Sequence, residues 1–235
     1  EISACLVGSE MCIRDSEKHG WWREIIDGGY IPRHDYQFLT FNVIGSPFGS
    51  SSKLNDPNFP QHLTLRDIVK AIEKGIKALD FDKINILIGA SLGGMQAMEL
   101  LYNNQFQIDK AIILAATGKT SSYSRAFNEI ARQAIHLGGK EGLSIARQLG
   151  FLTYRSSKSY DQRFTPDEVV TYQQYQGNKF KKNFDLQCYL TLLDVLDSHN
   201  IDRGRDDVDE VYQSLDTKVL TMGFIDDLLL SLIHI

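Results

Sequence analysis

The chain has 235 residues, 43% of them hydrophobic and 23% charged, a composition typical of one soluble globular domain. The formal net charge of −5 argues against a nucleic-acid-binding protein, which would usually carry a basic face. No apolar run reaches the roughly 18–20 residues that a membrane-spanning helix needs. The three cysteines are odd in number and have no metal-ligand spacing, so we expect no disulfide framework, no metal site and a reducing, cytoplasmic setting.

The two ends of the chain differ from the rest. Residues 1–16 show no clear helix or strand period and lack the pattern of a signal peptide, and residues 228–235 are an apolar tail without turn residues. Both ends resemble translated sequencing-adapter sequence. We therefore interpret residues 1–16 and 230–235 as non-native segments, and we expect an authentic protein truncated at both ends to lie between them.

The first part of the core is predicted over residues 17–119, beginning with a buried strand at 36–43. A loop rich in Gly, Ser, Pro and Asn follows at 45–60, as is common at the pocket-bordering end of a strand in an open α/β sheet. Thr64 is a candidate N-cap, with Asp67 three residues later, for a helix that runs to Leu79 with its apolar residues on one face.

The stretch Gly89-Ala90-Ser91-Leu92-Gly93 carries the clearest functional signal. The apolar run 84–88 predicts a strand before it, and the amphipathic run 94–101 predicts a helix after it. A serine at the apex of a strand–turn–helix between small residues is typical of a nucleophile elbow. Its hydroxyl would lie at a helix N-terminus, where the partial positive charge favours a developing anion. The alternative is an ordinary Gly/Ser turn.

The pattern changes after the next buried strand, predicted at 109–115. Two successive strand–helix–strand units favour a parallel sheet with right-handed crossovers. Residues 120–200 show only helical periodicity, with helices predicted at 122–137, 140–149, 166–181 and 186–196, and we interpret them as a helical cap inserted in the sheet. The core continues over 201–229, with a strand at 217–223. The predicted fold class is α/β.

Several stretches resemble the homoserine O-acetyltransferase family, the acyl-CoA-dependent branch of the α/β-hydrolase superfamily. In the core these are Gly20–Trp22, Asn42–Gly45, Thr64–Val69 and Gly89–Ala97. In the cap they are Ala126–Ile135, Gly142–Arg147 and Tyr175–Phe180. The resemblance spans about residues 17–229 and implies an α/β-hydrolase fold, a mostly parallel sheet with an inserted helical cap.

The resemblance assigns roles to individual positions. It implies that Ser91 is the nucleophile of a Ser-Asp-His triad and that the backbone N–H of Leu92 forms part of the oxyanion hole. Asp227 matches the triad acid, with Asp226 as the competing neighbour. Arg147 matches a cap arginine that binds the carboxylate of the amino-acid substrate; a surface arginine on an amphipathic helix is the alternative.

The triad histidine has no match. It should follow the acid by tens of residues, and the chain stops eight residues after Asp227. We therefore expect this polypeptide alone to be inactive, because the serine lacks its proton acceptor.

The implied reaction is ping-pong transfer of an acetyl group from acetyl-CoA, as co-substrate, to L-homoserine in methionine biosynthesis. The resemblance implies no bound cofactor, and it implies a homodimer formed through the cap. Three alternatives stay open: a succinyl donor or a serine acceptor, an ordinary α/β-hydrolase esterase, and a non-catalytic protein that keeps the scaffold for interaction.

Overall fold

A computed structural model describes residues 4–7, 28, 36–224 and 227–229. Within these residues, five strands form one parallel sheet in the order β2-β1-β3-β4-β5. The strands are β1 (Ala4–Val7), β2 (Phe38–Phe41), β3 (Lys83–Ala90), β4 (Gln107–Leu114) and β5 (Lys218–Met222). The register pairs Ile88 of β3 with Ile112 of β4, and Ile112 with Leu220 of β5. The predicted parallel sheet is confirmed.

Strand β1 corrects the sequence analysis, which assigned no strand to residues 1–16. Ala4–Val7 pairs with β2 on one side and with β3 on the other. A run of four residues is long enough to pair inside a sheet but too short to give a periodic signal. The interpretation of residues 1–16 as non-native stays a prediction.

Helices α2 (Leu65–Ala78) and α3 (Leu92–Asn103) flank the sheet and pack against each other. Helix α2 starts with the expected capping box, in which the hydroxyl of Thr64 accepts from the N–H of Asp67 and the carboxylate of Asp67 accepts from the N–H of Thr64. Its predicted apolar face is buried at Leu65, Ile68, Val69, Ile72 and Ile76, whereas Leu79, predicted as its last residue, is the exposed C-cap. Helix α3 is buried over most of its length because it lies between the sheet and α2.

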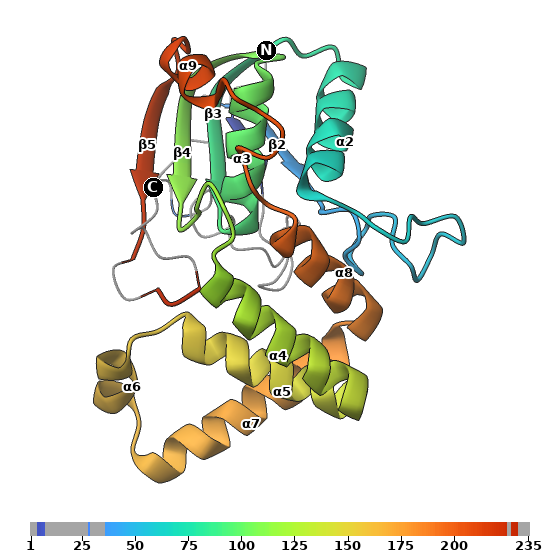
Figure 1. The fold of residues 1–235 in the computed structure, drawn as a ribbon, viewed down its shortest axis with the longest axis vertical. Helices are drawn as coiled ribbons and strands as arrows, with labels where there is room; N and C mark the ends of the chain where they lie inside the picture. The colour runs from blue at the N-terminus through green and yellow to red at the C-terminus, as the bar shows by residue number, and fades with distance from the viewer. Residues whose placement is uncertain (1–3, 8–27, 29–35, 225–226, 230–235) are drawn as a thin grey trace.

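The predicted cap helices are all present, some of them longer than expected: α4 (Ser122–Gly138), α5 (Lys140–Thr153), α7 (Pro166–Asn183) and α8 (Leu186–Asp197). The cap lies at the end of the sheet to which the arrows of β4 and β5 point (Figure 1). Helices α6 (Ser157–Arg163) and α9 (Val208–Gln213) were not predicted from the sequence; each is short and buries one residue. One continuous hydrophobic core runs from the sheet through α8 into the cap.

Two segments lie where the chain enters and leaves the cap, residues 117–120 and 198–202, and together we call them the cap hinge. They pair antiparallel: the N–H of Thr120 donates to the carbonyl of His199 at 3.1 Å, and the N–H of Ile201 donates to that of Gly118 at 2.9 Å. The cap is therefore joined to the core through a hydrogen-bonded pair of segments. Among the described residues, no helix is both long and apolar enough to cross a membrane.

Candidate active site

Ser91 lies between the end of β3 and the first residue of α3, as predicted. Its backbone has φ 52° and ψ −120°, a conformation that costs a non-glycine residue energy and that collects at functional sites. The N–H of Ser91 donates to the carbonyl of Leu114 at the end of β4, at 2.8 Å, which holds the turn against the sheet. The Ser91 side chain does not cap α3.

The turn leaves no room for a side chain at Gly89. A Cβ there would lie 2.3 Å from the carbonyl oxygen of Gly93, and backbone cannot yield as a flexible side chain can. Gly94, whose steric role the sequence analysis did not consider, is equally confined, because its Cβ would lie 2.5 Å from the Cβ of Ala116. Small residues on both sides of Ser91 are thus a steric requirement of this turn.

Leu92 is the first residue of α3, and its side chain is fully buried. Its backbone N–H belongs to the first turn of the helix, where amides have no partner within the helix and carry the positive end of the helix dipole. That is the position required of the predicted oxyanion-hole donor.

Asp227 follows β5 in a segment tied to the cap. Its Oδ1 accepts from the N–H of Leu229 at 2.8 Å, and the N–H of Leu228 donates to the carbonyl of Thr153 on α5 at 3.2 Å. The hydroxyl of Ser124 on α4 donates to the carbonyl of Leu229. The predicted competitor, Asp226, lies outside the described residues.

Asp227 also lines a cavity of about 950 Å³ between the cap hinge, the start of α4 and α9. Ser91 is not among the described residues that line this cavity. In a Ser-His-Asp arrangement the carboxylate contacts the imidazole rather than the serine, so the two need not meet directly.

Arg147 is buried, so the alternative prediction of a surface arginine on an amphipathic helix is wrong. It is 5% exposed, and its guanidinium lies over the rings of Phe151 and Phe180, 4.5 and 4.7 Å from their centroids. Stacking on two rings fixes the plane of the guanidinium, which suits the bidentate binding of a carboxylate. Lys181 on α7 is ion-paired with Glu141 on α5 at 2.6 Å.

Three further buried polar groups were not among the site residues predicted from the sequence. Glu99 on α3 is 1% exposed and ion-paired with two arginines. The amide of Gln96, also on α3, is fully buried, and neither of its polar atoms has a hydrogen-bond partner among the described residues. His199 in the cap hinge contacts the carbonyl oxygen of Thr117 through Nε2 at 2.8 Å, and burial lowers the pKa of its imidazole.

The fold and the strained serine define the class: an α/β-hydrolase-fold protein with a nucleophile elbow and a helical cap. A family profile described as "alpha/beta hydrolase fold" matches residues 16–137. The chain is 33% identical over 242 residues to a homoserine O-acetyltransferase of Cyclobacterium marinum, covering 92% of this chain and 69% of that protein. The chain is 31% identical over 249 residues to a homoserine O-acetyltransferase of Carboxydothermus hydrogenoformans, covering 89% of this chain and 65% of that protein.

A crystal structure of homoserine O-acetyltransferase from Staphylococcus aureus is 76% identical, with a TM-score of 0.92, and the match covers 98% of this chain and 72% of that one. The chain therefore belongs to the homoserine O-acetyltransferase family. It spans about two thirds of the length of the two curated relatives it matches.

Proposed function

We propose that this protein transfers the acetyl group of acetyl-CoA to the hydroxyl of L-homoserine through an acyl-enzyme on Ser91. The observation that carries the proposal is the strained turn that presents Ser91 at the N-terminus of α3. Membership of the homoserine O-acetyltransferase family supports the choice of donor and acceptor.

The reaction has two balanced halves. The Oγ of Ser91 attacks the thioester carbonyl carbon, the C–S bond breaks, and the coenzyme A thiol leaves with the serine proton. The homoserine hydroxyl then attacks the acyl carbon, the bond to Oγ breaks, and Ser91 recovers its proton. The developing oxyanion in each half is stabilised by the N–H of Leu92 and by the first turn of α3.

The proton is carried by a histidine that Asp227 orients and whose cationic form it stabilises. In the order Ser, Asp, His, this histidine would follow the acid by tens of residues, and no histidine of the printed sequence matches it. Arg147 binds the homoserine carboxylate with a guanidinium whose plane is set by Phe151 and Phe180. No bound cofactor takes part.

The test is coenzyme A thiol release by the protein at the length of its curated relatives. We expect release that requires acetyl-CoA, homoserine and Ser91 together, with the Ser91→Ala variant inactive. Release without homoserine would assign the protein to the hydrolases instead. Activity with succinyl-CoA or serine in place of the proposed substrates would contradict the proposed donor or acceptor.

We also propose a homodimer formed through the cap. On α4, Tyr123, Ile130 and Leu137 recur every seven residues, so they share one side of the helix, and Leu137 is 90% exposed. On α5, Ile145 and Leu152 repeat the spacing and are also exposed. Such stripes favour a protein–protein contact. Light scattering should give the mass of two chains, and Leu137→Glu should give one; a monomeric wild type would contradict the dimer.

The proposed chemistry also places the protein in a pathway and a compartment. Acetylating the homoserine hydroxyl makes it a better leaving group, which suits a step of methionine biosynthesis. We propose a cytoplasmic location, because Cys188 is free and buried. Fractionation of cells that express a tagged protein tests the location, and recovery with an extracytoplasmic fraction would contradict it.

A further inference from the structure

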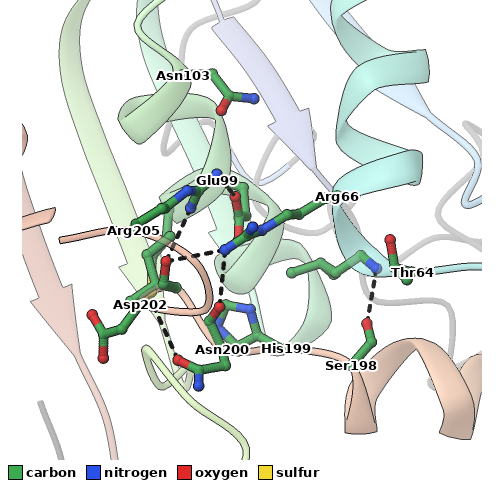
Figure 2. A network of polar contacts seen from close by, with 12 residues as sticks. Thr64, Arg66, Glu99, Asn103, Ser198, His199, Asn200, Asp202 and Arg205 are labelled. Carbon is green, nitrogen blue, oxygen red and sulfur yellow. Dashed lines mark hydrogen bonds and ion pairs between the residues drawn. The ribbon is translucent and has the colours of Figure 1, made fainter. Parts of the chain in front are cut away.

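Glu99 is a buried carboxylate two turns along α3 from Ser91, outside the proposed chemistry. It is 1% exposed, yet it keeps its charge partners: Arg66 Nε lies 3.2 Å from Oε1, and Arg205 Nη2 lies 2.7 Å from Oε2. Figure 2 shows the two arginines approaching it from different elements, one from α2 and one from the segment after the cap hinge. A buried carboxylate requires such partners, because removal from water disfavours its charge.

The same two arginines hold the cap hinge. Arg66 Nη2 donates to the carbonyls of Asn200 and Ile201, both at 3.2 Å, and Arg205 Nη1 donates to the carbonyl of Ile201 at 3.1 Å. Arg205 also lies over the ring of Tyr102 on α3, 3.6 Å from its centroid. Each guanidinium therefore bridges the nucleophile helix and the segment through which the chain leaves the cap, a task suited to its forked donors.

Helix α2 adds a second contact to this anchor. The N–H of Leu65, the first residue of α2, donates to the hydroxyl of Ser198 at 3.0 Å (Figure 2). Ser198 is the C-cap of α8 and the first residue of the returning hinge segment. Leu65 and Arg66 belong to Thr64–Val69, one of the stretches that carry the family resemblance. Two residues of a motif with no place in the chemistry thus contact the junction of cap and core.

The two segments of the cap hinge are also hydrogen-bonded to each other. Besides the two backbone hydrogen bonds, Thr120 Oγ1 donates to the carbonyl of Leu196 at 2.6 Å, and His199 Nε2 contacts the carbonyl of Thr117 at 2.8 Å. A displacement of the returning segment would therefore also move the outgoing segment and α4. Fixing residues 200 and 201 to α3 fixes the cap relative to the helix that begins at Ser91.

We infer that Glu99 is a positioning residue that, through Arg66 and Arg205, anchors the cap hinge to the nucleophile helix and thereby sets where the cap presents Arg147 to the acceptor bound at Ser91. The inference rests on the proposed function for the acceptor. The anchoring itself depends only on the contacts around Glu99.

The chain offers a matched control for this anchor. Glu73 on α2 accepts from Asn103 Nδ2 on α3 at 2.7 Å, so it links the same two helices as the Arg66–Glu99 pair without reaching the hinge. Glu99→Gln removes the charge at nearly constant shape and leaves both arginines without their carboxylate. Arg66→Lys is the second variant: an ammonium can still pair with Glu99 but cannot also serve both hinge carbonyls.

The experiment compares wild type, Glu99→Gln, Arg66→Lys and Glu73→Gln at the length of the curated relatives. Amide hydrogen exchange of Thr120 and Ile201 reports the hinge, and steady-state kinetics report the two half-reactions. We expect Glu99→Gln and Arg66→Lys to speed exchange at both amides and to raise the KM for homoserine about tenfold or more. Acylation of Ser91 by p-nitrophenyl acetate, which needs no acceptor, should stay near the wild-type rate, and Glu73→Gln should resemble wild type.

Two outcomes would overturn the inference. One is unchanged exchange at Thr120 and Ile201 in both anchor variants. The other is a parallel loss of ester acylation and acceptor transfer, or the same losses in Glu73→Gln, which would mean that Glu99 only stabilises α3. If the wild type transfers no acetyl group to homoserine, the proposed function fails, while the exchange comparison still decides the anchor.

Discussion

Replacing Gly89 by alanine tests the elbow through a single atom. The added Cβ would lie 2.3 Å from the carbonyl oxygen of Gly93, 2.6 Å from its carbonyl carbon and 2.9 Å from the nitrogen of Gly94, all of them backbone atoms. Cβ atoms are essentially never found closer than 3.0 Å to non-bonded atoms, so the first turn of α3 must move away from β3. The required shift is about 0.7 Å or more, close to the 1 Å displacement that costs about 100-fold in rate.

We therefore expect Gly89→Ala to lower the rate of Ser91 acylation by p-nitrophenyl acetate by about 100-fold and stability by about 1–3 kcal/mol. Stopped-flow absorbance measures the acylation rate, and urea unfolding measures the stability. Gly138→Ala is the control: outside its own helix backbone, its Cβ would meet no atom of the described residues within 4 Å. It should therefore keep the rate and gain up to about 1 kcal/mol as a helix residue. A Gly89→Ala enzyme that acylates at the wild-type rate would refute the steric argument.

Three further substitutions test buried polar groups. Gln96→Met should raise the free energy of unfolding by about 1 kcal/mol, because the buried amide has no partner in the described part of the chain. A lower free energy in urea unfolding would mean that its polar atoms are bound. Burial lowers the pKa of His199 below its ordinary 6.5, so the stability it contributes is full above pH 6.5 and is lost as the pH falls toward the folded-state pKa. The free energy of unfolding should therefore change less with pH between 7.5 and 5 in His199→Gln than in the wild type. The same pH dependence in both proteins would contradict this. Arg147→Lys should raise the KM for homoserine about 10–100-fold, since an ammonium cannot fork onto a carboxylate, and an unchanged KM would leave Arg147 a packing role only.

The elements that the sequence predicts well are those with local signals. Helix α2 has a capping box and a regular apolar face, and the β3–Ser91–α3 turn has its glycines in place, so a short window suffices for each. Strand β1 and helices α6 and α9 were missed because four to seven residues give too few periods to recognise. Tertiary pairing, rather than local propensity, places them.

The site follows the same division. Ser91 was predictable because its constraint lies within two residues on either side. The Glu99 anchor was not, because Arg66 is 33 residues away from Glu99 and its hinge carbonyls are more than 130 residues away from Arg66. The stacking of Arg147 also depends on Phe180, which comes from another helix. The turn that holds Ser91 was therefore predictable from the sequence, whereas the contacts around Glu99 and Arg147 required the structure.

The most direct test of the account is to trap the acyl-enzyme. The protein, at the length of its curated relatives, is mixed with acetyl-CoA alone, quenched in acid and digested, and the peptide that contains Ser91 is analysed by mass spectrometry. We expect one acetyl group on Ser91, its loss when homoserine is added before the quench, and no acetyl group on that peptide in Ser91→Ala. Homoserine acetylation that proceeds at the wild-type rate in Ser91→Ala would contradict the nucleophile and, with it, the proposed function.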